Sequence, residues 1–273
     1  MSKLGTLHTT IKQQHVGATG KRVLLVEGPD DVQAFRAWLG KIDAAWENGW
    51  VVAEAKKKSN VLELLAREPN WVGVVDRDEW TEQAVAEKQR ELDNLWILPR
   101  FCLENYLCDP DELWAMLPPA QQQKIQGGYQ TLHTVITGEL RLWCQHGALW
   151  QVINPLWEGL RALGFKERLL DIQHAGNEPV IRQTLNDWHQ FLEPDAIWAG
   201  YQARMIEVAG WAVGRQLQSG VHGKQFFPSV VNTALTQLLG EQAKASERQN
   251  RLLQNAQPPV DLLPLWQKMG LPH

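Results

Sequence analysis

Acidic side chains directly follow two short apolar runs, and their spacing could support metal-ion chemistry. Glu27 comes after the run at residues 23–26, and Asp76 and Asp78 come after the run at residues 71–75. Residues two apart point to the same side of an extended chain, so Asp76 and Asp78 can reach one site. Three converging carboxylates repel one another and raise one another's pKa values, and a divalent cation relieves that repulsion. Because carboxylate oxygens suit Mg²⁺ or Mn²⁺, the sequence predicts a site for one of these metals.

For these carboxylates to meet, the two apolar runs must be neighbouring strands of one sheet. Continuous β-branched runs bounded by turn residues are typical of buried parallel strands. Strand and helix patterns alternate here, which favours an α/β fold with a parallel sheet and flanking helices. Ligands of such sheets lie beyond the carboxyl ends of the strands. The predicted strands cover residues 23–26, 50–55, 71–75 and 95–98, and the predicted helices between them cover about residues 31–39, 61–65 and 81–92.

The chain changes character after about residue 110. Proline and glycine pairs at residues 118–119 and 127–128 indicate a loop or linker, and apolar residues then recur at helical spacing. We therefore expect an N-terminal arm or edge element at residues 1–20, an α/β domain at residues 21–110 and a mainly helical domain at residues 111–273. The expected helices of the last part cover residues 131–146, 153–163, 179–191, 195–218 and 229–254.

Several short motifs of the first half resemble the Toprim domain of topoisomerases, bacterial primases, recombination-repair proteins and overcoming-lysogenization-defect (OLD) nucleases. The resemblance covers about residues 20–110. It rests on Val-Glu-Gly-Pro-Asp-Asp at residues 26–31 and on Asp-Arg-Asp at residues 76–78. Leu-Glu-Asn-Tyr-Leu at residues 103–107 and Gly-Lys at residues 223–224 further resemble small OLD-like Toprim proteins, which are encoded beside ABC-type ATPases in anti-phage systems.

This resemblance implies a role for each matching residue. Glu27 corresponds to the Toprim glutamate, a metal ligand or general acid/base, and Asp76 and Asp78 correspond to the metal-binding Asp-x-Asp. Asp31 corresponds to an acidic position that could ligate a second metal ion, although an aspartate there could equally cap the following helix. Glu104 could complete the metal shell or pair with Arg100.

Basic side chains are the other candidates for the site. Lys224 corresponds to a late lysine thought to assist the transition state in OLD-like nucleases, although a loop lysine is more often simply solvated. Lys56, Lys57 and Lys58 form a basic run that could contact nucleic-acid phosphates or could be a solvated charge run. His222 could carry a proton, although a lone histidine is usually not catalytic.

The composition limits the classes of partner. The formal net charge is −4, so phosphate contacts must come from local patches or from bound metal rather than from an overall basic surface. The three cysteines argue against a disulfide scaffold. No apolar run approaches the length of a membrane span or a signal sequence, so a soluble cytoplasmic protein without membrane contact is expected.

These observations and the Toprim resemblance lead to a Mg²⁺- or Mn²⁺-dependent endonuclease, with two metal ions acting on a phosphodiester. The resemblance implies a toxic effector of an anti-phage system with an ABC-type ATPase partner. A homodimer is also compatible with the tryptophan-rich helices. The sequence does not separate DNA, messenger RNA and transfer RNA as the target. The alternatives are a non-catalytic regulatory or scaffold subunit of an ATPase complex and a metal-dependent phosphatase.

Overall fold

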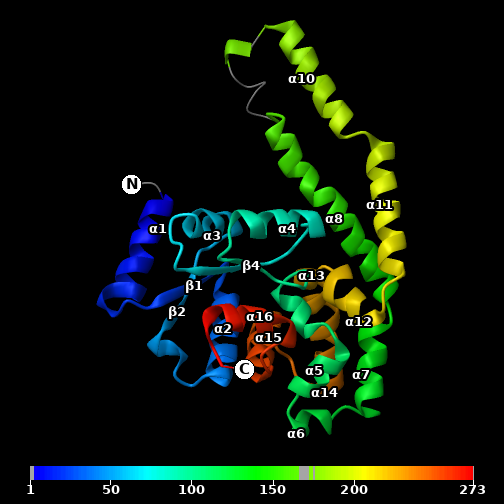
Figure 1. Cartoon of the computed structure of the whole chain (residues 1–273). Helices are drawn as coiled ribbons and strands as arrows, with labels where there is room; N and C mark the ends of the chain where they lie inside the picture. The colour runs from blue at the N-terminus through cyan, green and yellow to red at the C-terminus, as the bar shows by residue number, and fades with distance from the viewer. Residues whose placement is uncertain (1–2, 166–171, 175, 273) are drawn as a thin grey trace.

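A four-stranded parallel sheet forms the centre of the N-terminal half. The computed structural model describes residues 3–165, 172–174 and 176–272. The strand order is β2-β1-β3-β4, and every neighbouring pair is parallel (Figure 1). The predicted α/β class and parallel sheet are therefore confirmed, and each strand differs by only one residue or so from its predicted range. The strands are β1 (Arg22–Val26), β2 (Trp50–Glu54), β3 (Val72–Val75) and β4 (Leu95–Ile97).

Alternate residues of β1 face two hydrophobic clusters, one on each side of the sheet. Leu24 and Val26 pack with α2 (Pro29–Ile42), and Val23 and Leu25 pack with α3 (Lys58–Leu65). Pro29 at the first turn fixes the backbone angle that begins α2, and Gly28 precedes it as the N-cap. Both faces of the sheet are therefore covered, which explains why β1 and β3 are continuously apolar.

The first residues form a helix instead of the expected polar arm or edge element. Helix α1 (Lys3–Ile11) places Ile11, which is 2% exposed, in the cluster on the α3 side of the sheet. His8 Nε2 lies 2.6 Å from Oε1 of Glu68, and Lys12 pairs with the same carboxylate. The scattered apolar residues of this segment thus cover part of the sheet.

The helical half is continuous with the core of the sheet. The larger cluster contains Leu24 and Val26 of β1 together with Leu217, Phe226 and Leu265 from the second half. Helix α16 (Leu263–Met269) returns the C-terminus to the sheet, where the carbonyl oxygen of Met269 accepts a hydrogen bond of 3.2 Å from Trp50 Nε1. One hydrophobic cluster therefore joins residues from both predicted domains.

Several expected helix boundaries are wrong. The chain breaks at Gly138 and Glu139, so the two helices expected over residues 131–163 are instead α7 (Gly128–Thr137) and α8 (Leu140–Ala162), and α8 continues through Pro155. The helix expected to end near residue 218 ends at Ala209. The one expected over residues 229–254 is divided at Gly240, whose φ of 67° favours glycine.

Helices α8, α10 (Glu178–Phe191) and α11 (Pro194–Ala209) form an arm that rises away from the body of the molecule and returns to it (Figure 1). None of the described helices is both long and apolar enough to cross a membrane. The remaining helices are α4 (Glu82–Glu91), α5 (Pro110–Met116), α6 (Pro119–Gln122), α12 (Val213–Arg215), α13 (Gly223–Phe226), α14 (Asn232–Leu239) and α15 (Ala245–Asn255), and short 3-10 and π turns connect them.

Candidate metal centre

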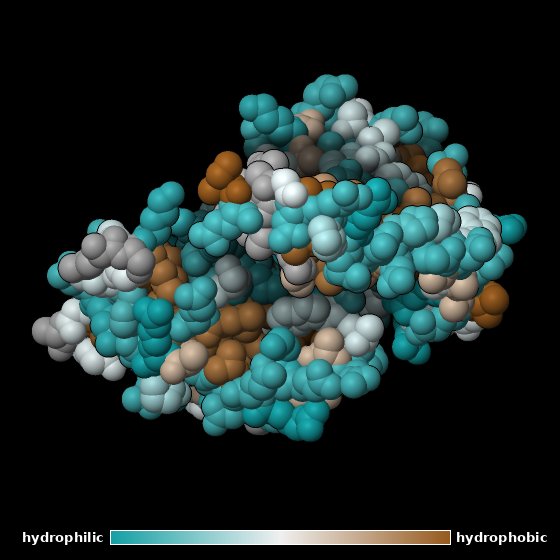
Figure 2. Space-filling view, turned by 90° about the horizontal axis from the view of Figure 1, so that it is seen from above, coloured by the Kyte–Doolittle hydropathy of each residue, from teal (hydrophilic) through white to brown (hydrophobic). Residues whose placement is uncertain are grey.

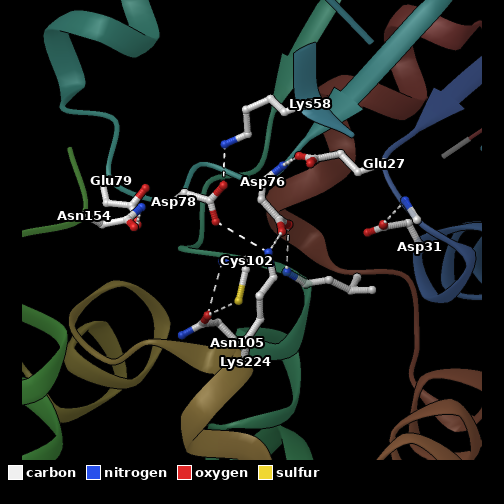
Figure 3. Close-up of polar contacts among 12 residues, drawn as sticks. Glu27, Asp31, Lys58, Asp76, Asp78, Glu79, Cys102, Asn105, Asn154 and Lys224 are labelled. Carbon is white, nitrogen blue, oxygen red and sulfur yellow. Dashed lines mark hydrogen bonds and ion pairs between the residues drawn. The ribbon is translucent and has the colours of Figure 1, made fainter. Parts of the chain in front are cut away.

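Glu27, Asp76 and Asp78 lie together at the carboxyl ends of two adjacent parallel strands. One ligand oxygen from each carboxylate lies within 4.8 Å of those of the other two. Glu27 follows β1 and the two aspartates follow β3, as Figure 3 shows. The backbone N–H of Asp76 donates a hydrogen bond of 2.9 Å to Oε1 of Glu27, which ties the two strand ends together. Oxygen donors at this spacing could hold a divalent cation.

Asp76 is the most deeply buried member of the cluster, with 6% of its surface exposed. Its Oδ1 accepts a hydrogen bond of 3.1 Å from the backbone N–H of Leu103, and its Oδ2 lies 2.6 Å from Nζ of Lys224. Burial raises the pKa of Asp76 well above its ordinary value, and Lys224 opposes that rise. A buried carboxylate with a single cationic partner is a strong candidate to bind a second positive charge.

The sequence predicted that Asp78 reaches the cluster by alternation along an extended strand. Asp78 instead reaches it by a turn in the backbone. Strand β3 ends at Val75, and Asp78 has a φ of 50°, in the left-handed region that aspartate tolerates better than most residues. Its N–H donates a hydrogen bond of 2.7 Å to the carbonyl oxygen of Phe101. The turn carries the Asp78 side chain back towards Asp76 and Glu27.

Two lysines approach the carboxylates from different elements. Lys224, at the start of α13, lies 2.6 Å from Asp76 and 3.6 Å from Asp78. Lys58, the first residue of α3, pairs with the other oxygen of Asp78 and lies 4.4 Å from the ring centroid of Trp80. In Figure 3 the two ammonium groups lie on opposite sides of the Asp78 carboxylate. Burial would lower the pKa of Lys224, but Asp76 and Asp78 raise it overall, so the side chain stays charged.

The run Lys56, Lys57 and Lys58 is divided by the fold. Lys58 is bound inside the acidic cluster, whereas Lys56 and Lys57 are exposed. Lys56 lines the cavity in front of Glu27 and Asp76, and its φ of 72° marks the turn between β2 and α3. Lys56 is therefore the residue of this run best placed to meet a phosphate entering that cavity.

Asp31 and Glu104 add two further carboxyl groups beside Asp76. Both line a cavity of about 220 Å³, together with Glu27, Asp76 and Lys224. Burial, together with repulsion from Glu27 and Glu104, raises the pKa of Asp31 to about 7 although its Oδ2 accepts a 2.8 Å hydrogen bond from the N–H of Gly28. That bond satisfies the N-cap N–H of α2, so Asp31 helps to cap the helix while its carboxylate still borders the cavity.

Glu104 is not the partner of Arg100, which was one interpretation of the sequence. Arg100 instead binds Glu112 at 2.6 Å and Asp261 at 3.0 Å. Oε2 of Glu104 is buried and has no hydrogen-bond partner among the described residues. A buried unpaired carboxylate oxygen beside a cavity costs free energy unless a cation or water satisfies it, so this observation fits a second metal ligand.

His222 is an unsuitable proton carrier at neutral pH. Burial and the nearby Lys224 lower its pKa to about 4, so the imidazole is neutral. Its ring packs 4.3 Å from that of Trp150 and 5.1 Å from that of Phe101, measured between centroids. The residue has a packing role on the loop that carries Lys224.

The structure gives positioning roles to residues for which the sequence predicted none. Asn105 Nδ2 donates hydrogen bonds of 2.7 Å and 3.2 Å to the carbonyl oxygens of Leu217 and Val221, which fixes the segment before Lys224. Oε1 of Glu79 accepts hydrogen bonds of 2.6 Å from Trp150 Nε1 and 2.9 Å from Asn154 Nδ2. Trp150 and Asn154 lie one turn apart on α8, but no sequence signal connects them to Glu79, 71 and 75 residues away.

The donor set as a whole fits hard divalent cations. Carboxylate oxygens dominate it, and burial raises the pKa values of Glu27, Asp31 and Asp76, as expected of an acidic cluster that lacks enough positive charge. A second ion could lie between Asp31 and Glu104.

Comparison with known proteins found no family model that matches the chain and no curated protein with a similar sequence.

Proposed function

We propose that this protein is a metal-dependent endonuclease of the Toprim type. The observation that carries the proposal is the convergence of Glu27, Asp76 and Asp78, with ligand oxygens within 4.8 Å, at the carboxyl ends of adjacent parallel strands. The resemblance of residues 26–31 and 76–78 to Toprim motifs supplies the reaction class, which is cleavage of a phosphodiester. Burial of Asp76 and the raised pKa values around it make the cluster unfavourable without added positive charge.

Each residue of the candidate site has a distinct role in this proposal. Glu27, Asp76 and Asp78 would hold a first Mg²⁺ or Mn²⁺ ion, and Asp31 and Glu104 would help to hold a second. When bound, such ions lower the pKa of a coordinated water and neutralise the attacking and leaving oxygens of the phosphodiester. Lys224 stays protonated beside Asp76, and its ammonium group can offset negative charge that develops on the phosphate.

The biological setting rests on the resemblance to small OLD-like proteins. We propose a toxic effector of anti-phage defence, acting in the cytoplasm on DNA or RNA and restrained or triggered by an ABC-type ATPase. The formal net charge of −4 supports this arrangement, because a protein without an overall basic surface binds nucleic acid weakly until local sites or a partner position it.

The direct test is cleavage of plasmid DNA and of total RNA by the purified chain, alone and with its ATPase partner, in Mg²⁺, Mn²⁺ or EDTA. Glu27→Gln and Asp76→Asn should abolish metal-dependent cleavage, because each removes one anionic ligand with little change in shape. Asp93→Asn is the matched control, since Asp93 is an exposed carboxylate outside the acidic cluster. Phosphate release from a small ester without nucleic-acid cleavage would identify a phosphatase. Partner binding without any hydrolysis would identify a scaffold.

A further inference from the structure

A second and larger cavity opens beside Asp78. Its volume is about 770 Å³, and it lies between the loop that follows β3 and the base of the helical arm. Figure 2 shows the molecule hollowed between the α/β region and the arm. We call this cavity the arm groove. The residues that line it and matter here are Arg77, Asp78, Trp80, Arg204, Trp211 and Arg215.

The arm groove combines guanidinium groups with indole rings. The guanidinium carbons of Arg204 and Arg215 lie 4.7 Å and 4.3 Å from the ring centroid of Trp211. Trp80 lines the groove from the side of the metal centre and lies under Lys58. Stacked cations and aromatic rings at one surface are the groups that hold nucleic-acid bases and phosphates.

The arm groove has no net positive charge, so an anion in it would depend on one local cation. Arg204 pairs with Glu207 at 2.6 Å and Arg77 with Glu82 at 3.0 Å, so these two cations are largely neutralised. Within the described part of the chain Arg215 has no carboxylate partner, and it is exposed. Glu79 keeps its negative charge, because the two side chains of α8 that bind its carboxylate are neutral donors.

We propose that the arm groove binds an unpaired stretch of nucleic acid and leads it to the metal centre. The choice of ligand rests on the proposed nuclease function. Asp78 belongs to both the groove and the acidic cluster, so a strand lying in the groove passes directly beside the carboxylates. A base would take the place of the Arg215 guanidinium on the Trp211 ring, and the displaced guanidinium would contact a phosphate.

An unpaired strand suits this surface better than a duplex does. In a duplex the flat faces of the bases are covered by their neighbours, so Trp211 could not stack on them. The volume of about 770 Å³ is within the range of roughly 300–1,000 Å³ that is typical of pockets for small ligands, which matches one or two nucleotides. A groove of this kind selects splayed-out bases, as in loops, ends or melted segments.

The test measures the binding of dye-labelled 12-nucleotide single strands of RNA and of DNA, and of the corresponding duplexes, to the full chain. Fluorescence anisotropy is recorded in EDTA and in Ca²⁺. Trp211→Ala should weaken single-strand binding by about 5- to 150-fold, the range expected for one lost base stack. Arg215→Gln should lower the slope of log Kd against log salt concentration by about 0.7. The matched controls are Trp157→Ala and Arg182→Gln, which change exposed residues of the arm outside the groove.

Each outcome decides one claim. Weaker binding by both groove variants with unchanged controls supports the arm groove, and the ratio of the RNA and DNA affinities identifies the strand type. The arm-groove proposal is overturned if wild type and groove variants bind equally well. It is also overturned if duplex binds as tightly as single strands or more tightly, or if neither buffer gives any binding. If the groove variants lose binding while Mg²⁺ and Mn²⁺ give no cleavage, the nuclease proposal fails and the groove stands. If the protein cleaves nucleic acid and the groove variants bind as wild type does, the arm-groove proposal fails and the nuclease proposal stands.

Discussion

The ammonium nitrogen of Lys224 lies 2.6 Å from Oδ2 of Asp76. It therefore occupies part of the space between carboxylate oxygens in which a metal ion would bind. In the metal-free protein this contact compensates a buried carboxylate. A metal ion binding to Asp76 must share or replace that compensation. Lys224 is therefore both a stabilising partner and a competitor of the metal.

This relationship predicts the behaviour of Lys224→Met. Without the ammonium group the metal-free protein should melt at a lower temperature at pH 8, because Asp76 loses its cation. The increase in Tm on adding Mn²⁺ should be larger than in wild type, since the ion then compensates an unpaired charge. Thermal melts with EDTA and with Mn²⁺ measure both quantities. Lys57→Met, at an exposed lysine, is the control. Equal Mn²⁺-dependent increases in all three proteins would contradict the competition.

Asp31 predicts a dependence of stability on pH. Its pKa is raised from 3.8 to about 7, mainly by burial. Between these values the folded state holds a proton that the unfolded chain releases, so this residue makes stability fall as pH rises from about 4 to 7. Asp31→Asn keeps an acceptor for Gly28 and removes the charge. In EDTA it should raise Tm at pH 8 and leave Tm nearly unchanged at pH 4. A Tm gain of equal size at both pH values would show that the charge is not responsible.

The strands and the acidic cluster could be predicted because they depend on local sequence. The run before Glu27 and the run before Asp76 are buried and β-branched, which is typical of parallel strands, and the topology of such sheets brings their ends together. The turn at Asp78 was not predictable from alternation, because its φ of 50° depends on the hydrogen bond to Phe101, 23 residues away.

The helical arm was harder to predict for a related reason. The helix patterns left a gap at residues 147–152, yet α8 runs through this gap and through Pro155 without interruption and packs against α11. The links from Trp150 and Asn154 to Glu79 join residues more than 70 positions apart. Only the packed structure creates such contacts, so local patterns give no signal for them.

Gly223 predicts how tightly the position of Lys224 is determined. A Cβ atom at this residue would lie 2.3 Å from Oδ1 of Asn105 and 2.8 Å from Sγ of Cys102, so Gly223→Ala must displace the start of α13. We expect a loss of about 1–3 kcal/mol in the free energy of unfolding and a weaker dependence of Tm on Mn²⁺. Urea unfolding with and without Mn²⁺ measures both. Gly49→Ala is the control, because nothing lies within 4 Å of a Cβ there. Identical behaviour of the two variants would refute the steric argument.

The hydrogen bonds to Glu79 predict that the arm orients the metal centre. Glu79 directly follows Asp78, and its carboxylate is held by Trp150 and Asn154 of α8. Trp150→Phe combined with Asn154→Ala should release this loop and weaken Mn²⁺ binding by about 10-fold, the lower end of what lost outer-shell contacts cost. Isothermal titration calorimetry measures the affinity directly.

The matched control for that double variant is Leu149→Ala, which shortens an exposed side chain of the same helix. It should bind Mn²⁺ as wild type does. The double variant should also remain folded, because Glu79 can exchange its lost partners for water at the edge of the arm groove. A double variant with wild-type Mn²⁺ affinity would show that Asp78 is positioned by its own turn and by Phe101 alone, and that the arm acts on the substrate and not on the metal.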